Sequence, residues 1–182
     1  ALETALQRNS TNVSDLNFDG ISTLNAQLVT DTSGSFTTSR IAKDEQYMFY
    51  LSGYDDTTQQ ISGSPYGDDI QFSISDPNSS TYCASDQTKF ALELTFVDTS
   101  VTPSVIKRSL LDDCSIIEGT ELKWNFGTAY NLTTETMSST LLIMRLVSES
   151  ADFGGAKITV SRESGTWPLQ GKTLISTAKT AT

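Results

Sequence analysis

The chain has 182 residues, of which 12 are basic, 22 are acidic and none is histidine, and its net charge is −10. A charge this negative argues against nucleic acid and anionic membrane as the main partners. Histidine is the usual general base near neutral pH and the commonest metal ligand. Its absence therefore excludes Ser-His-Asp and Cys-His catalytic sites and ordinary zinc sites. We expect a protein of one domain that is not an enzyme.

Serine and threonine make up more than a quarter of the chain, with 25 serines and 26 threonines. Threonine suits the solvated face of a strand and serine suits turns, and this bias is typical of secreted β proteins. The predicted location is therefore extracellular, at the cell surface or beyond it. The chain begins at Ala1 without a signal peptide or an apolar run of membrane-spanning length. We expect that a leader was removed, or that a membrane segment precedes the sequence.

Residues 1–45 contain the helix-like stretches of the chain. The segment ALETALQR at 1–8 predicts a short helix, because Leu2 and Leu6 are four residues apart and share a helix face. The segment STLNAQL at 22–28 permits either a second helix or an extended strand. The whole region is predicted to be a helix stub followed by a connecting segment.

Within this region, the segment DLNFDG has the pattern of the first half of a calcium loop. Asp15, Asn17 and Asp19 stand at alternate positions, Gly20 follows at once, and Ile21 occupies the seventh position. In an EF-hand loop these positions supply side-chain oxygens, the sharp turn and a carbonyl ligand. The acidic residue of the twelfth position is missing, so a distant Asp or Glu has to complete the shell. We predict one structural calcium ion; the alternative is an Asx-rich turn that ends the first helix.

From residue 46 onward the pattern becomes strand-like, with apolar and polar residues alternating as in strands that bury one face. Residues 140–147 are instead apolar on both faces apart from Arg145, which predicts a central strand. Residues 54–69 form a long polar stretch and predict a loop between two strands. The predicted strands are QYMFYLSG (46–53), DIQFSISD (69–76), KFALELTFVD (89–98), ELKWNFG (121–127), TLLIMRLV (140–147), AKITVSR (156–162) and KTLISTAKT (172–180).

Seven or more strands after a short helical start predict a mainly β fold. The expected architecture is an antiparallel sheet or a two-sheet β-sandwich with a short N-terminal helix. Residues 1–45 then form the helix stub and connecting segment with the calcium loop, and residues 46–182 form the β-rich part of the domain.

Cys83 and Cys114 are the two cysteines of the chain. An even count in an acidic chain rich in Ser and Thr predicts one disulfide, whereas two buried thiols would indicate a cytosolic protein. A bond between them closes a loop of about 30 residues and contributes roughly 3–4 kcal/mol in the chain-entropy model.

Four Asn-x-Ser/Thr sequons stand in predicted turns, at Asn9, Asn12, Asn78 and Asn131. They are glycosylation candidates in a secreted archaeal or eukaryotic protein, and ordinary loop residues in a bacterial one. In a chain this rich in Ser and Thr, chance accounts for much of the count.

The patterns that sometimes mark a catalytic site carry little weight in this chain. Two Ser-x-x-Lys matches, at 104–107 and 176–179, lie in stretches that look extended, whereas the catalytic motif needs a helix. Three aspartate pairs, at 55–56, 68–69 and 112–113, offer carboxylates for a glycosidase, but paired aspartates in loops are usually solvated.

The order of the segments resembles the exported part of a type IV pilin-like subunit, such as a minor pilin or pseudopilin. Such proteins have an N-terminal helix that packs in the filament, a connecting loop, an antiparallel sheet and often one disulfide. The resemblance is one of layout and composition over the whole chain. It implies that residues 1–8 are the stub of the helix, that residues 9–45 are the connecting region, and that Cys83 and Cys114 form the disulfide.

The predicted function is a non-catalytic subunit of an extracellular filament or surface assembly, such as a pilus, pseudopilus or fibre, stabilised by calcium. Its partners are then other copies of itself or related subunits, with no nucleic acid and no membrane contact from this segment. One alternative is a secreted sugar-binding or adhesive β-sandwich that binds surface glycans through exposed aromatic side chains. A further alternative is a virion structural protein. The aromatic candidates stand in loop-like stretches, at Tyr54, Tyr66, Tyr82 and Trp167.

Overall fold

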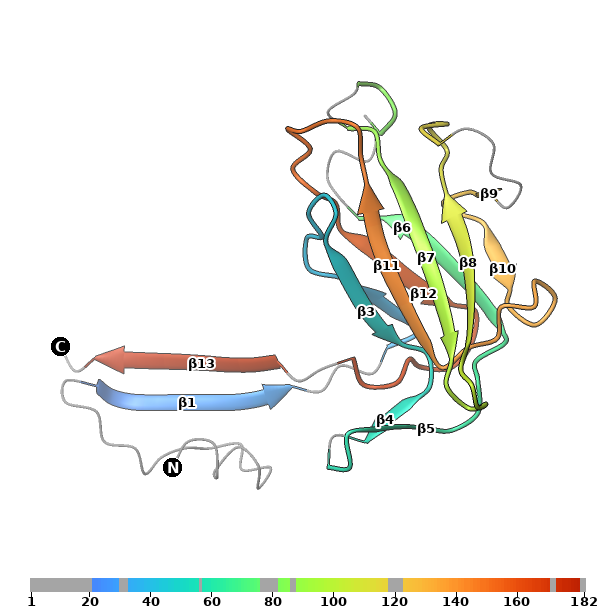
Figure 1. The fold of residues 1–182 in the computed structure, drawn as a ribbon. Coiled ribbons are helices and arrows are strands. Elements are labelled where there is room, and N and C mark those ends of the chain that lie inside the picture. Colours follow the sequence, from blue (N-terminus) through green and yellow to red (C-terminus); the bar gives the residue numbers. More distant parts are fainter. Residues whose placement is uncertain are drawn as a thin grey trace. The chain divides into compact units, whose positions relative to one another are not determined.

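In the computed structural model the chain forms two compact units (Figure 1). One unit comprises Ala1–Asp31 and Leu169–Thr182, and the other comprises Thr32–Pro168. The helix predicted over 1–8 lies outside the described residues. The structure describes residues 33–55, 57–75, 82–85, 88–117 and 123–170, together with the backbone of 21–29 and 173–180.

All regular structure in the described residues is β, which confirms the mainly β fold. Pairing is antiparallel throughout, apart from the short parallel contact between β8 and β9. The strands are β1 (Ile21–Val29), β2 (Ser35–Thr37), β3 (Gln46–Tyr50), β4 (Gly53–Asp55), β5 (Gln60–Ser62), β6 (Asp69–Ile74), β7 (Ala91–Asp98), β8 (Val105–Leu111), β9 (Lys123–Trp124), β10 (Ala129–Asn131), β11 (Leu141–Val147), β12 (Ile158–Arg162) and β13 (Thr173–Thr180).

The described part of the first unit is a two-stranded antiparallel ribbon of β1 and β13. Its register runs from Ile21 opposite Thr180 to Val29 opposite Thr173. The helical reading of residues 22–28 is therefore wrong, and the extended reading is correct. Residues four apart share a face in a helix and in a strand alike, so the local spacing could not separate the two conformations. The pairing with β13, which is distant in the sequence, decides between them.

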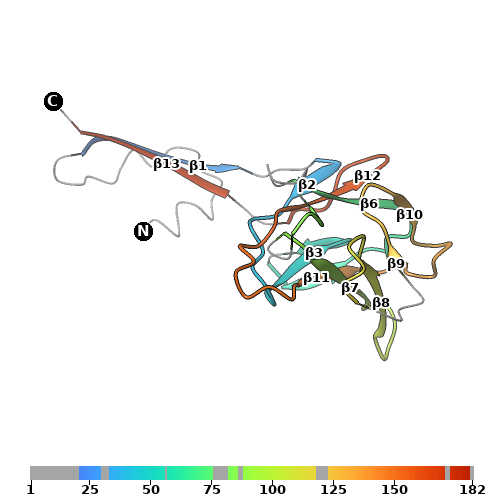
Figure 2. The same ribbon diagram turned by 90° about the horizontal axis from the view of Figure 1, so that it is seen from above.

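The second unit contains two sheets packed face to face (Figure 2), together with the two-stranded pair β4-β5. One sheet has four strands in the order β10-β6-β12-β2, and the other has five strands in the order β3-β11-β7-β8-β9. In β11, Leu142, Met144 and Leu146 are fully buried and the alternate residues are partly exposed. This strand lies between β3 and β7, so its predicted interior position is correct.

The core between the two sheets follows from the alternation that the sequence shows. The inward residues of β6, β7 and β12 are apolar except at two strand ends, Asp98 of β7 and Arg162 of β12, so each strand buries an apolar edge against the opposite sheet. Aromatic rings close the sides of this core. Phe36 of β2 lies 5.5 Å from Phe49 of β3, and Trp124 of β9 stacks on Tyr130 of β10 at 4.3 Å between ring centroids.

The polar stretch at 54–69 differs from the single loop that the sequence predicts. It contains the strand β5, which pairs with β4 through Gly53–Ser62, Tyr54–Ile61 and Asp55–Gln60. A carboxylate oxygen of Asp55 accepts the amide hydrogen of Thr57 at 2.8 Å, and this bond shapes the turn between the two strands.

Candidate interaction surface

The outward side of the five-stranded sheet carries a row of apolar residues. The strand register places Tyr50 of β3 opposite Leu141 of β11, Leu141 opposite Val97 of β7, and Val97 opposite Ile106 of β8. Directly paired residues in a sheet project from the same face, so these four side chains form one apolar row across four strands.

The next row along the strands is half apolar. Met48 of β3 lies opposite Ile143 of β11, Ile143 lies opposite Thr95 of β7, and Thr95 lies opposite Arg108 of β8. The Met48 side chain is 54% exposed and that of Ile106 is 61% exposed. We define the apolar face by the residues of both rows: Met48, Tyr50, Val97, Ile106, Leu141 and Ile143.

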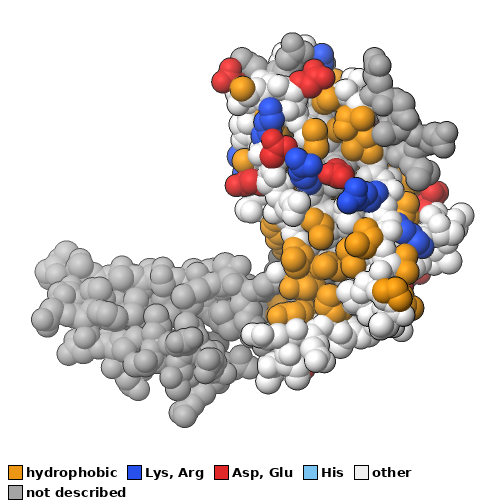
Figure 3. Space-filling view, in the orientation of Figure 1, with side chains coloured by type: hydrophobic (Ala, Val, Ile, Leu, Met, Phe, Trp, Pro, Cys, Tyr) orange, Lys and Arg blue, Asp and Glu red, His pale blue; other side chains and the backbone are white. Residues whose placement is uncertain are grey.

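Figure 3 shows this side of the molecule, with hydrophobic side chains gathered over the ends of β3, β11, β7 and β8. Apolar side chains that contact water lose the favourable free energy of burial, so a contiguous apolar face on a folded domain is a candidate interaction site. Scattered single exposed hydrophobic residues would not support this inference.

A row of charged residues borders the apolar face. Arg145 of β11 donates to a carboxylate oxygen of Asp44 at 3.0 Å, and its other terminal nitrogen lies 3.5 Å from a carboxylate oxygen of Glu93 on β7. Arg108 of β8 follows in the adjacent row. Two positive and two negative charges thus balance here, although the whole chain has a net charge of −10.

The outward side of the four-stranded sheet is different in character. Ser35 and Ser161 share a hydrogen bond of 3.1 Å between their hydroxyls, and Thr37 and Thr159 share one of 2.7 Å. Gln71 of β6 lies opposite Ser161 and donates to the Gly127 carbonyl. Polar side chains of this kind are stable in contact with water. The outer face of the four-stranded sheet therefore does not need to be covered by another protein, unlike the apolar face.

A shallow depression of about 290 Å³ lies at the end of this polar side. Asn131 donates its amide hydrogen to an oxygen of Asp69 at 2.8 Å, so both groups are used within the fold. Arg162 donates to the carbonyls of Ser164 and Thr166 at 2.6 and 2.8 Å. The lining residues are Asp69, Ile70, Gln71, Ala129, Ser161, Arg162 and Glu163.

Two of the four aromatic candidates for glycan binding are buried. Trp167 is 2% exposed and donates its indole hydrogen to the Val160 carbonyl at 3.0 Å. Tyr66 is 8% exposed and donates its hydroxyl hydrogen to the Asp69 carbonyl at 2.7 Å. The guanidinium of Arg162 lies over both rings, at 4.6 Å from the Tyr66 centroid and 5.1 Å from that of Trp167. The expectation that these two rings are exposed is therefore wrong.

The third aromatic candidate, Tyr54, lies beside the apolar face. Its ring stacks on that of Tyr50, with 4.6 Å between the centroids and 18° between the ring planes. Both side chains are partly buried by this stack. The pair extends the apolar face toward the hairpin of β4 and β5.

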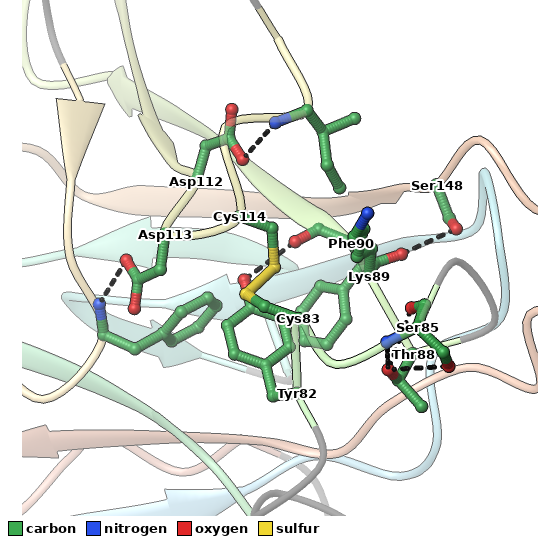
Figure 4. Close-up of a disulfide and its surroundings, with 12 residues drawn as sticks. Tyr82, Cys83, Ser85, Thr88, Lys89, Phe90, Asp112, Asp113, Cys114 and Ser148 are labelled. Atoms are coloured by element: carbon green, nitrogen blue, oxygen red, sulfur yellow. Dashed lines mark hydrogen bonds between the residues drawn. A yellow bond between two sulfur atoms is a disulfide. The ribbon is translucent and has the colours of Figure 1, made fainter.

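The fourth candidate, Tyr82, belongs to the surroundings of the disulfide (Figure 4). It donates its hydroxyl hydrogen to the Phe90 carbonyl at 2.8 Å, and its ring packs on those of Phe90 and Phe126. Burial raises the pKa of Tyr82 well above its usual value, and the nearby charge of Asp113 raises it further. Tyr82 therefore serves the packing of this region.

The predicted disulfide between Cys83 and Cys114 is confirmed, with 5.2 Å between the two Cα atoms. Next to it, the buried carboxylate of Asp112 accepts the amide hydrogens of Ile116 and Ile117 at 2.9 and 2.8 Å. This aspartate of the 112–113 pair holds the turn after β8, contrary to the expectation of a solvated pair.

Several predicted site residues lie outside the described part of the chain. The calcium ligands Asp15, Asn17 and Asp19 are among them, and Ile21 is described only as the first backbone position of β1. Among the residues that the structure does describe, no group of three or more Asp, Glu or Cys side chains is arranged to hold a metal ion. The sequons at Asn9, Asn12 and Asn78 also lie outside, whereas Asn131 is exposed at the end of β10.

The two Ser-x-x-Lys matches are extended, as predicted. Residues 105–107 begin β8, and residues 176–179 lie within β13. Neither match therefore has the helical arrangement that the catalytic motif requires.

Comparisons with protein-family models, with curated proteins and with solved structures found no match to this chain. In the described part of the chain, no helix has the length and hydropathy that crossing a membrane requires. The disulfide is typical of proteins from an oxidising, extracellular setting.

Proposed function

We propose that this chain is a non-catalytic subunit of an extracellular filament or surface assembly, and that the apolar face is one of its subunit contacts. The observation that carries the proposal is the exposure of Met48 and Ile106 within a continuous apolar surface. A contact of this kind has an apolar centre and a charged rim, and the row of Arg145, Glu93 and Asp44 supplies such a rim.

Two further observations support a structural role. The disulfide suits a secreted chain, and the long ladders of β7 with β8 and β11 suit a rigid building block. The pilin-like order of segments is compatible with the same role. We propose location outside the cell on these grounds.

A secreted sugar-binding module remains the second candidate, since the depression at Asp69, Gln71 and Glu163 offers polar groups at the surface. Sugar sites also rely on exposed rings against which the apolar face of a sugar packs. Trp167 and Tyr66 are buried, and Tyr54 and Tyr82 are partly buried, so no ring of the four candidates is fully open to solvent. The apolar face therefore favours the assembly subunit.

The calcium ion stays a proposal of its own. We propose that Asp15, Asn17, Asp19 and the Ile21 carbonyl hold one ion with a structural role. Millimolar calcium is expected to raise the melting temperature relative to chelator, by an amount that corresponds to roughly 1–3 kcal/mol in the free energy of unfolding. The difference should disappear in Asp15→Ala and Asp19→Ala, and an equal shift in all three proteins would place the ion elsewhere.

The proposed contact is tested by the accessibility of the apolar face in the native assembly. Ile106→Cys places a thiol at the most exposed position of the face, and Ala129→Cys places one on the opposite sheet. A maleimide is expected to label both thiols readily on the dilute, purified chain. In the native assembly the thiol at position 106 should be labelled far more slowly, while labelling at position 129 should not change.

Equal labelling at position 106 in the purified chain and in the native assembly would contradict the proposal. The native disulfide does not react with maleimide, so it needs no removal. The thiol at position 129 reports any general loss of access in the assembly.

A further inference from the structure

We infer that the apolar face binds the same face of a second copy of this chain, across a two-fold axis that runs parallel to β11 and β7. The inference rests on the proposed function, in which this face is a subunit contact. It adds that the partner is a second copy of the chain, and it specifies which residues of the two copies face each other. It requires that one surface be complementary to itself, which is the condition for an isologous interface.

The charged rim meets this condition. Arg145 of β11 and Glu93 of β7 are direct cross-strand neighbours in the sheet. A two-fold axis between the two strands exchanges their positions. Arg145 of one copy then lies over Glu93 of the other, and the reverse pair forms on the other side of the axis. Two intermolecular ion pairs follow from one pair of residues.

The same two-fold rotation brings apolar residues of the two copies together. Leu141 of one copy lies over Val97 of the other, and Tyr50 lies over Ile106, because the axis also exchanges β3 with β8. Two twisted sheets with parallel strand directions pack at about −30° and about 10 Å apart, which is the common aligned packing of sheets. The row of Tyr50, Leu141, Val97 and Ile106 thus meets itself across the width of the face, and in the next row Met48 of one copy lies over Arg108 of the other.

An axis perpendicular to the strands gives a different result. When it passes through the intervening row of Ile143 and Thr95, it places the apolar row of Leu141 and Val97 over the charged row of Arg145 and Glu93. Both charges would then lose water without gaining a partner, which is strongly unfavourable. Compared with that arrangement, the charge pattern favours the axis parallel to the strands.

The same pattern favours a second copy over an unrelated partner of one sign of charge. A basic partner would place positive charge against Arg145, and an acidic partner would place negative charge against Glu93. Two copies of a chain with net charge −10 repel each other over most surfaces. At this face the charges of Asp44, Glu93, Arg108 and Arg145 balance, so the face itself adds no net repulsion.

The test exchanges the charges of the rim in the full chain. Arg145→Glu and Glu93→Arg are each expected to weaken self-association at least about tenfold, since each places like charges over one another at two positions of the dimer. An equimolar mixture of the two variants should associate as the wild type does, because each chain supplies the charge that the other lacks. The double variant R145E/E93R should also recover wild-type association. Sedimentation equilibrium over a concentration series measures all five samples.

Ala129→Glu adds a charge at an exposed position of the opposite sheet and serves as the matched control, with association expected to equal that of the wild type. Thermal unfolding of each variant confirms that the sandwich is intact. Association that is unchanged in the single variants, or that the mixture fails to restore, would overturn the inference.

A wild-type chain that stays monomeric would also overturn it. If the thiol of Ile106→Cys is nevertheless protected in the native assembly, the face has another partner and the proposed function stands. If that thiol is freely labelled there, both proposals fail.

Discussion

Reduction of the Cys83–Cys114 disulfide is expected to lower the free energy of unfolding by roughly 3–4 kcal/mol. The two cysteines are 31 positions apart, and the loop between them contains β7 and β8. The bond therefore ties together the two ends of the longest hairpin of the five-stranded sheet. Without the bond the unfolded chain gains conformational freedom, and the folded state loses relative stability.

Urea unfolding with and without reductant measures this loss. The double substitution Cys83→Ser with Cys114→Ser is expected to match the reduced wild type, which separates loss of the bond from effects of the reductant. The dependence of the unfolding free energy on urea should also steepen, because an unlinked chain exposes more surface when it unfolds. An unchanged midpoint after complete reduction would show that the bond does not constrain the unfolded chain.

Trp167→Ala is expected to cost about 3–5 kcal/mol of stability, the range for removing a buried aromatic side chain. The ring fills the space between the sheets beside Phe49, at 5.1 Å between centroids, and beside Tyr66, at 5.0 Å. The substitution removes these contacts, the cation–π contact with Arg162 and the hydrogen bond that the indole donates to the Val160 carbonyl.

Two further variants separate these contributions. Trp167→Phe keeps an aromatic ring but removes the indole hydrogen bond, so a smaller cost of about 1–3 kcal/mol is expected. Tyr54→Ala removes a ring from a partly exposed stack and should cost about 0.5–1.5 kcal/mol. If Trp167→Ala costs no more than Tyr54→Ala in chemical unfolding, the ring at position 167 is not part of the core.

The sequence predicts best the strands that have one face buried along their whole length. In β6 and β7 the apolar residues alternate, and Ile70, Phe72, Leu92 and Leu94 are all fully buried. The pattern and the final burial agree because the opposite sheet covers the whole strand. The disulfide was also predictable, since two cysteines allow one pairing.

The sequence was less informative where burial depends on residues distant in the chain. Trp167 stands in a stretch without strand pattern, and it is buried because the chain turns back over Arg162 and the end of β12. The same holds for Tyr66, which a bridge to Ser139 brings into the core. Loop position alone therefore predicted exposure for side chains that long-range contacts cover.

A signal for the apolar face was present in the sequence. Residues 140–147 are apolar on both faces, and this pattern predicts a strand in the centre of a sheet. The position is correct, but Leu141 and Ile143 point outward, where the described residues leave them partly exposed. A strand that is apolar on both faces in a two-layer sandwich indicates one face for the core and one for a partner.

The contact between two copies is tested most directly by chemical cross-linking of Met48→Cys with Arg108→Cys. The inferred two-fold axis places position 48 of one copy over position 108 of the other, while like positions lie about three strand spacings apart, or roughly 14 Å along the sheet. A short bismaleimide is therefore expected to join the two variants when they are mixed, and to link either variant with itself only weakly. Absence of the mixed product, or equal yields with each variant alone, would contradict the account.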